Sequence, residues 1–183
     1  MRIIGGKYGG QRIQPPAHMP HTRPTTDIAK EGLFNIIENS FNLEGIRTLD
    51  LFGGTGCISY ELASRGADDL TIVEKDARQA QFIRKTADRL GIPNLQLLKT
   101  DVFRFLQQCD GQYDFIFAGP PYALREIDQL PVLVFEKNIL RAGGWFVLEH
   151  TPRNDYSRHP RFYRQRNYGT TIFSIFTHGT ETA

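Results

Sequence analysis

The stretch that decides the fold runs from residue 46 to residue 56 and reads Ile-Arg-Thr-Leu-Asp-Leu-Phe-Gly-Gly-Thr-Gly. Its first seven residues predict a buried β-strand, and the glycines that follow break that strand. The apolar spacing from Cys57 to about Arg65 then predicts a helix. A strand, a glycine-rich turn and a helix in this order are typical of the first unit of a doubly wound, ligand-binding sheet.

Strands and helices alternate along the chain as far as residue 149. The apolar runs predict strands at residues 46–52, 70–74, 95–99, 113–118 and 145–149. The apolar stripes before and between them predict helices at residues 26–38, 57–65, 77–90, 101–106 and 125–139. This alternation predicts an α/β fold with a mostly parallel sheet that is covered by helices on both faces.

The C-terminal part of the chain departs from that alternation. Residues 162–168 and 171–178 predict two strands joined across Gly169-Thr170. We expect them to form an antiparallel hairpin at one edge of the sheet. With the five earlier strands, this hairpin gives a seven-stranded sheet.

The N-terminal part departs from it as well. Residues 1–14 predict a small β-hairpin that turns near Gly9-Gly10. Residues 15–25 contain four prolines and predict an extended connector. We therefore expect two parts: an N-terminal basic hairpin and connector at residues 1–25, and an α/β domain at residues 26–183.

Composition places the protein among ordinary globular proteins. The chain has 183 residues, of which 40% are hydrophobic and 23% are charged. It has no apolar run of the roughly 18–20 residues that a membrane span needs, and residues 1–7 contain no apolar core of a secretory signal. Two cysteines predict no disulfide framework. We expect a cytoplasmic protein that does not contact a membrane.

The charges are distributed unevenly, although the net charge is only +2. Residues 1–25 contain Arg2, Lys7, Arg12 and Arg23 and no acidic residue, and residues 153–168 contain five arginines and one aspartate. Two basic ends around an acidic middle favour a polyanionic partner such as a nucleic acid. The alternative is that these are ordinary solvated side chains.

The glycine-rich turn predicts a site for an adenosine cofactor. Glycines let the backbone approach a ligand closely, and Glu74, twenty residues after Gly54, can accept the hydroxyl protons of a ribose. Asp50 would repel a pyrophosphate but would attract an ammonium group. The third glycine of the dinucleotide fingerprint is replaced by Ser59. Charge and spacing therefore favour S-adenosylmethionine over a nicotinamide dinucleotide.

Cofactor contacts are expected from the turn and from the ends of the strands. The residues concerned are Asp50, Phe52, Gly53, Gly54, Thr55, Gly56, Glu74, Lys75, Asp101 and Val102. Two of them have alternative interpretations. Asp50 can instead be a buried polar group that satisfies the loop backbone, and Asp101 can either bind the adenine amino group or cap the helix that follows it.

The motifs together resemble a known family. The residue 50–56 turn, Val73-Glu74-Lys75-Asp76 and Pro120-Pro121-Tyr122 resemble class I, Rossmann-like methyltransferases that use S-adenosylmethionine. Met1 to Gly10 and Arg23-Pro24-Thr25-Thr26-Asp27 resemble the RsmD-type 16S rRNA guanine-N2-methyltransferases more specifically. The resemblance covers about residues 1–150.

The resemblance implies methyl transfer to the exocyclic N2 of a guanine in bacterial 16S rRNA, within assembled or assembling small ribosomal subunits. It assigns catalysis to the segment after the fourth strand, Gly119, Pro120, Pro121 and Tyr122. In the family an Asp or Asn side chain and a backbone carbonyl accept the N–H bonds of the amine, and the aromatic ring stacks on the base. We expect a monomer, S-adenosylmethionine as the cofactor and no metal.

Gly119 departs from the family pattern, because it stands where the family has Asp or Asn. It offers no side-chain acceptor, so a charge-assisted hydrogen bond of about 1.5–3 kcal/mol is missing. Three explanations stay open: a weak enzyme or one supported by another residue, a protein that binds without catalysing, or a chain with an Asp-to-Gly change. On the sequence alone, we expect Gly119→Asp to raise methyl transfer.

RNA contacts are expected from Arg2, Lys7, Arg12 and Arg23, which would bind phosphates. Tyr8 can stack on a base or pack within the hairpin, and Arg23 to Thr26 can instead fold over the cofactor. Cys57 is expected to be a small packing residue rather than a reactive thiolate. Competing functions are methylation of DNA adenine or of a glutamine amide, a non-catalytic RNA-binding or ribosome-assembly role, and, with less support, a nicotinamide oxidoreductase.

Overall fold

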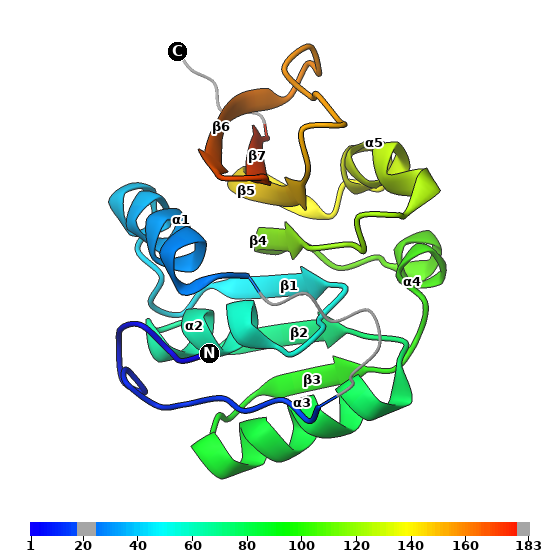
Figure 1. Cartoon of the computed structure of the whole chain (residues 1–183). Helices are drawn as coiled ribbons and strands as arrows, with labels where there is room; N and C mark the ends of the chain where they lie inside the picture. The colour runs from blue at the N-terminus through cyan, green and yellow to red at the C-terminus, as the bar shows by residue number, and fades with distance from the viewer. Residues whose placement is uncertain (18–24, 179–183) are drawn as a thin grey trace.

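The computed structural model describes residues 1–17 and 25–178. Its centre is one sheet of seven strands in the order β3-β2-β1-β4-β5-β7-β6 (Figure 1). The strands are β1 Arg47–Leu51, β2 Asp69–Val73, β3 Leu95–Leu98, β4 Tyr113–Ala118, β5 Leu140–His150, β6 Phe162–Tyr168 and β7 Thr171–Thr177. The helices are α1 Asp27–Ser40, α2 Cys57–Ser64, α3 Ala77–Leu90, α4 Val102–Gln108, η1 Arg125–Asp128 and α5 Gln129–Glu136.

Strands β1 to β5 pair in parallel, and β7 pairs antiparallel with both β5 and β6. The mixed, Rossmann-like sheet with antiparallel C-terminal strands is thus confirmed. Parallel strands need crossover connections, and the helices supply them on both faces. In Figure 1 the arrows of β1 to β4 therefore point the same way, so that their carboxyl ends meet at one edge.

The helices form two layers. Leu49 and Leu51 of β1 point into a core covered by α4 and α5, because alternate residues of a strand face opposite sides. Phe115 and Phe117 of β4 point the other way, into a core covered by α1 and α2. Helix α3 continues that second layer through Ile83, which packs on the β2 strand.

Two elements differ from the sequence prediction. The helix expected at residues 125–139 divides into η1 and α5, because Glu126 leaves helical geometry at φ −88° and ψ 17°. Pro131 is tolerated because it lies in the first turn of α5. The last parallel strand begins at Leu140, not at Trp145, and its pairing with β4 shifts register between Tyr113 and Phe115.

The expected N-terminal hairpin of two strands is not formed. Residues 1–14 make a single antiparallel bridge, between Arg2 and Arg12, with Ile3 N donating to Gln11 O at 2.9 Å. Ile3 and Ile13 are each 1% exposed and pack on α2 and α3. The segment is therefore a loop with a short antiparallel pairing, attached to the domain by its own apolar side chains.

A buried carboxylate also holds this loop. Glu61 of α2 is 0% exposed, and it accepts hydrogen bonds from Ile4 N at 2.9 Å and Gly5 N at 3.0 Å. Its charge is balanced by Lys30 Nζ of α1 at 3.3 Å and by Arg65 Nε at 2.9 Å. Glu61 thus joins α1, α2 and the N-terminal loop.

Candidate active site

The candidate site lies at the carboxyl ends of β1 and β4. The strand order reverses between these two strands, and ligands bind at such a switch point in open α/β sheets. Gly119 N donates to Leu51 O at 3.3 Å. The residues after β4 therefore begin directly beside the glycine-rich turn after β1.

The glycine-rich turn has an unusual backbone. Phe52, Gly54 and Gly56 all have positive φ, at 61°, 59° and 83°. Positive φ is costly for a residue with a side chain and often marks a functional site. A Cβ on Gly56 would lie 2.5 Å from the Tyr60 ring, whereas a Cβ on Gly54 would meet no atom closer than 3.6 Å. The packing of α2 thus requires Gly56, while a Cβ on Gly54 would make only ordinary contacts, the nearest with Gln79 Oε1.

Asp50 lies beneath this turn. It is 2% exposed, and its Oδ2 accepts a hydrogen bond from Ser59 Oγ at 2.8 Å. Burial raises the pKa of Asp50 to about 8, against the opposing effect of the Ser59 hydrogen bond, and the charge of Glu74 adds to the rise. A cation placed beside Asp50 would stabilise the ionised carboxylate. The sequence alone did not reveal Ser59 as its partner.

Glu74 follows β2 and holds the turn from below. Its Oε1 accepts from Gly54 N at 2.8 Å, and its Oε2 accepts from Asp76 N at 2.8 Å. Burial raises the pKa of Glu74, while these two backbone hydrogen bonds lower it. Each carboxylate oxygen has a second acceptor position, so this geometry is compatible with further hydrogen bonds from ribose hydroxyls.

The other residues expected to contact the cofactor lie at the start of α4, after β2 and in the glycine-rich turn. Asp101 caps α4, because its Oδ1 accepts from Phe103 N at 2.9 Å and Arg104 N at 3.2 Å. The capping interpretation is confirmed, and contact with adenine stays a prediction. Val102 is buried at the start of α4, and Lys75 is exposed. Thr55 is 3% exposed.

The segment after β4 turns sharply. Leu124 N donates to Pro121 O at 2.9 Å, and Pro120 is buried while Pro121 is exposed. The Tyr122 ring is partly exposed, and its hydroxyl donates to Glu149 Oε2 at 2.9 Å. A Cβ on Gly119 would lie 3.1 Å from the edge of the Phe117 ring, so a side chain fits there after a small shift of that ring.

Sequence reasoning missed Glu149, which joins this site. It is 6% exposed, near the end of β5, and its Oε1 accepts from Thr25 Oγ1 at 3.0 Å. The contact brings Thr25, just before α1, to the carboxyl end of the sheet. The predicted strand at 145–149 already ended at Glu149, and the rule that ligands bind at strand carboxyl ends was a signal that could have identified it.

The structure separates the predicted RNA-binding residues. Arg2 and Arg12 are neighbours across the bridge and are both exposed, and Arg2 Nε lies 3.4 Å from Asp27 Oδ2. Lys7 N donates to Ser64 O at the C-terminal end of α2. Lys7 therefore lies at the amino ends of the strands, away from the candidate site. Arg23 lies outside the described residues.

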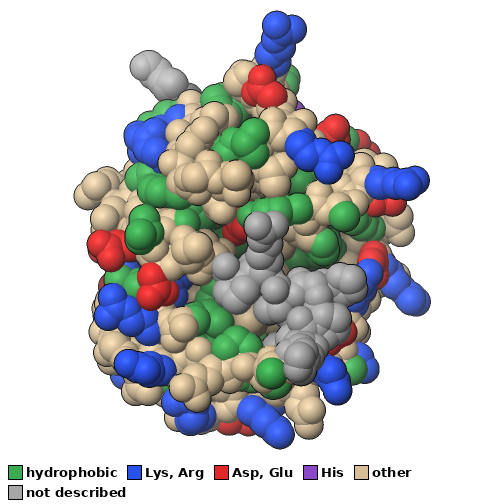
Figure 2. All heavy atoms as spheres, viewed as in Figure 1, with side chains coloured by type: hydrophobic (Ala, Val, Ile, Leu, Met, Phe, Trp, Pro, Cys, Tyr) green, Lys and Arg blue, Asp and Glu red, His purple; other side chains and the backbone are tan. Residues whose placement is uncertain are grey.

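Two further features clarify the surface around the loop. Tyr8 is 9% exposed and packs with Ile3 and Ile13, so the packing interpretation of Tyr8 is confirmed. In Figure 2 the lysine and arginine side chains are spread around the outline, with a group along the edge where α3 lies, and they form no single patch.

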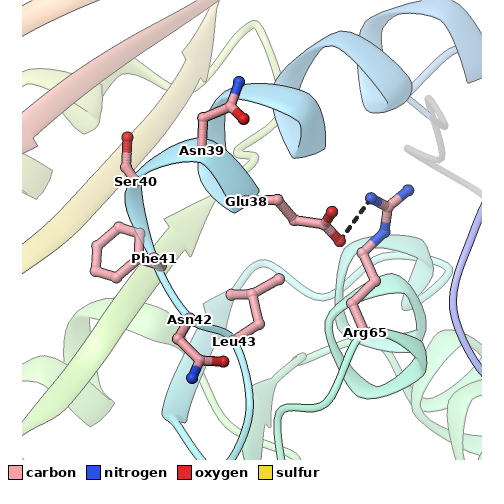
Figure 3. Close-up of a pocket in the computed structure, with 7 residues that line it drawn as sticks. All are labelled: Glu38, Asn39, Ser40, Phe41, Asn42, Leu43 and Arg65. Atoms are coloured by element: carbon pink, nitrogen blue, oxygen red, sulfur yellow. Dashed lines mark hydrogen bonds and ion pairs between the residues drawn. The ribbon is translucent and has the colours of Figure 1, made fainter.

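Two depressions lie away from the candidate site. One, of about 560 Å³, is lined by residues 38–43 and Arg65 (Figure 3). The other, of about 530 Å³, includes Lys7, Tyr8 and Ile92 in its lining. Both lie at the amino ends of the strands, because residues 38–43 precede β1 and Arg65 follows α2. In Figure 3 the ion pair of Glu38 and Arg65 crosses the first depression.

Other chemistries receive no support from the described part of the chain. Within residues 1–17 and 25–178, no three His, Cys, Asp or Glu side chains are placed to hold a metal ion. In the same ranges no helix is both long and apolar enough to cross a bilayer. Burial raises the pKa of Cys57 by more than the nearby charge of Lys30 lowers it. Cys57 is therefore a packing residue and not a thiolate.

Comparisons with known proteins identify the family of the chain. The family model described as "Conserved hypothetical protein 95" matches residues 1–177. A Buchnera aphidicola subsp. Baizongia pistaciae protein named "Ribosomal RNA small subunit methyltransferase D" is 31% identical over 149 residues, which cover 81% of this chain and 75% of that protein. YlbH of Bacillus subtilis is 33% identical over 154 residues, covering 82% of each chain.

A solved structure shows the same architecture. A hypothetical protein of Thermus thermophilus superposes with a TM-score of 0.84 at 27% identity, over 97% of this chain and 99% of that one. The match includes the sheet that carries the glycine-rich turn and the segment after β4. The chain belongs to the RsmD/YlbH family of S-adenosylmethionine-dependent methyltransferases, the family described as Conserved hypothetical protein 95.

Proposed function

We propose that the protein transfers a methyl group from S-adenosylmethionine to the exocyclic N2 of a guanine in 16S rRNA. The observation that carries the proposal is the hydrogen bond from Gly119 N to Leu51 O at 3.3 Å. It joins the turn expected to bind the cofactor to the segment expected to bind the base. Relatives named for small-subunit rRNA methylation, at 30–31% identity, support the choice of RNA.

The donor set fits this cofactor. Asp50 would pair with the ammonium of its methionine part, and Glu74 would accept the ribose hydroxyls. Gly54 carries no side chain that would stand between its backbone and a ligand, and no atom lies closer than 3.6 Å to its Cβ position. When bound, the cofactor supplies an electrophilic methyl group. The buried, protonated state of Asp50 in the free protein is compatible with a partner that is a cation.

The segment after β4 would receive the target base. Pro120 and Pro121 restrict the backbone, so that a carbonyl is held toward the amine. The Tyr122 ring would stack on the guanine, an interaction of about 1–3 kcal/mol, while the Tyr122–Glu149 hydrogen bond fixes its orientation. The amine needs no tuned general base, because its proton can leave after the new bond has formed. The guanine has to be splayed out of any helix.

The RNA would be positioned by exposed cations of the N-terminal loop. Arg2 and Arg12 are suitable because they are neighbours on the N-terminal loop, and phosphate contacts position a nucleic acid without reading its sequence. Lys7, at the amino ends of the strands, would reach only a distant part of a large substrate. The division into a basic residue 1–25 part and a methyltransferase domain at residues 26–183 belongs to this proposal, as does action by a monomer.

The test is methyl transfer from labelled cofactor to small ribosomal subunits from a strain that lacks the modification. The parent protein is compared with Asp50→Leu, which removes the expected partner of the ammonium. We expect label on a single guanine with the parent and at least tenfold less with Asp50→Leu. Label on DNA or protein instead would move the assignment to another amine, and cofactor binding without transfer to any substrate would favour a binding role.

A further inference from the structure

Glu149 and Gly119 are neighbours at the carboxyl ends of adjacent strands. Strand pairing places Ala118 opposite Leu148, so the next residue on each strand continues that register. Phe117 and Val147, two residues earlier than Gly119 and Glu149, point into the core under α1 and α2. Side chains alternate along a strand. The Glu149 side chain and any side chain at position 119 therefore point to the same face of the sheet.

The distance between them is short. A Cβ on Gly119 would lie 3.7 Å from Glu149 Oε1, with only the Phe117 ring nearer, at 3.1 Å. The carboxylate of an aspartate at position 119 would thus reach the region that the Glu149 carboxylate already occupies. Glu149 is also fixed in place, since Thr25 and Tyr122 donate hydrogen bonds to its two oxygens at 3.0 and 2.9 Å.

Resting on the methyl-transfer function proposed above, we infer that Glu149 supplies the side-chain acceptor that Gly119 lacks. Its carboxylate accepts an N–H bond of the target guanine amine. A carboxylate has about four acceptor positions, so the hydrogen bonds from Thr25 and Tyr122 are compatible with a further one from a substrate. The site therefore has its acidic residue on β5, one strand away from the usual position after β4.

The reaction balances with this assignment. A bond forms between N2 and the methyl carbon, and the bond from that carbon to sulfur breaks with its electron pair left on sulfur. Positive charge grows on N2 as the bond forms, and the Glu149 carboxylate stabilises it through the shared N–H. The cationic amine loses one proton to solvent after the new bond has formed, so Glu149 acts as a hydrogen-bond acceptor and not as the base.

Removing the acceptor tests the role directly. Glu149→Leu should lower kcat about ten- to a hundred-fold, with KM for the RNA and the affinity for S-adenosylhomocysteine changed only a few-fold. Glu149→Gln should retain most of the rate, because its amide oxygen still accepts. Gly119→Asp added to Glu149→Leu should restore kcat at least partly. The matched control is Glu136→Gln, an exposed carboxylate on α5, which should leave kcat unchanged.

A second measurement does not depend on the fold of the leucine variant. If Glu149 already supplies the acceptor, Gly119→Asp in the parent should give no gain in kcat or should lower it, because two carboxylates then share one region. This outcome differs from the one expected from the sequence alone, which left position 119 without an acceptor. A rise of tenfold or more in the Gly119→Asp protein would overturn the assignment.

A binding measurement with short RNA fragments tells failure of this inference apart from failure of the proposed function. An RNA fragment with one unpaired guanine is compared with the same fragment carrying inosine, which lacks the N2 amine, both with S-adenosylhomocysteine present. The parent should prefer guanine several-fold, and Glu149→Leu should bind both equally. A parent that is inactive on 16S rRNA but shows this Glu149-dependent preference would contradict only the rRNA target. Equal binding of the two fragments by the parent would overturn the role of Glu149.

Discussion

Lys30 Nζ lies 3.3 Å from Glu61 Oε1 beneath the N-terminal loop, and the two side chains are 1% and 0% exposed. A buried charge is stable only where it is paired and hydrogen-bonded. Glu61 also receives the amides of Ile4 and Gly5 and the guanidinium of Arg65. Glu61 is therefore a polar attachment of the loop to the domain, beside the apolar contacts of Ile3 and Ile13.

Glu61→Leu should lower the free energy of unfolding by about 3–5 kcal/mol, because Lys30 is then buried without its partner. Urea unfolding measures the loss, and hydrogen exchange at the Ile4 and Gly5 amides should become faster. The exposed Glu31 of the adjacent helix offers a control, since Glu31→Gln should change stability by no more than about 0.5 kcal/mol. Equal stability of the two variants would mean that the loop is held by its apolar side chains alone.

The titration of Asp50 predicts a pH dependence of stability. Burial raises its pKa from 3.8 to about 8 in the folded protein, so between these values the folded state holds a proton that the unfolded state has lost. Stability therefore falls as pH rises through this window. Relative to the parent, Asp50→Asn should gain stability progressively from pH 4 to pH 8 and level off above it. Asp88→Asn, an exposed carboxyl, should show no such trend.

The same group makes a prediction about cofactor binding. At pH 7 the carboxyl of Asp50 is mostly protonated in the free protein, given its pKa of about 8. A bound ammonium stabilises the ionised form, so binding of S-adenosylmethionine should release close to one proton. Calorimetry in two buffers of different ionisation enthalpy measures that number. Release that is unchanged in Asp50→Asn would show that the proton comes from another group.

Glycine substitutions distinguish ligand contact from backbone strain. Gly54 and Gly10 both have positive φ, and neither has an atom within 3.5 Å of its Cβ position. Alanine should therefore cost each about 1–2 kcal/mol of stability. We expect Gly54→Ala alone to weaken S-adenosylmethionine binding, by tenfold or more. Gly56→Ala should destabilise most, because its Cβ would lie 2.5 Å from the Tyr60 ring. Loss of cofactor affinity in Gly10→Ala as well would point to a general effect of strain.

Arg12 makes a prediction about RNA. Arg12→Glu should weaken binding of a 16S rRNA fragment several-fold at moderate salt and reduce its salt dependence, with cofactor affinity unchanged. Lys137→Glu is the matched control, because Lys137 is also exposed but lies at the end of α5, which covers the opposite face of the sheet. If both substitutions weaken binding equally, the effect is one of net charge and not of a contact at Arg12.

The sequence predicted what local chemistry determines. The helix at residues 77–90 was predicted with the bounds that the structure gives, because Asp76 caps one end and Gly91, at φ 72°, ends the other. The position of the glycine-rich turn followed in the same way, from apolar runs and glycines that need no distant partner. The β5 strand was predicted too short, because its first five residues, Leu-Arg-Ala-Gly-Gly, form no continuous apolar run and are placed by pairing with β4.

The contacts that the sequence could not predict join residues far apart in the chain. Glu61 and Ile4 are 57 positions apart, and Glu149 and Thr25 are 124 apart. Neither pair has a local pattern, because Glu61 and Glu149 fit an ordinary helix and strand, while Ile4 and Thr25 lie in loops. Lys7 was placed with Arg2 by its proximity in sequence, yet Lys7 pairs with the end of α2 and Arg2 with the start of α1.

The position of β7 has a consequence for biosynthesis. This strand is made after β6, yet it lies between β5 and β6 in the sheet. A chain emerging from the ribosome as far as residue 168 has β6 without its neighbour, and β5 with an unpaired edge beside Glu149. Domains are synthesised from the N-terminus, so the pairing of β5 with residues 171–177 closes the sheet last. The carboxyl end of β5 is therefore among the final parts of this enzyme to mature during translation.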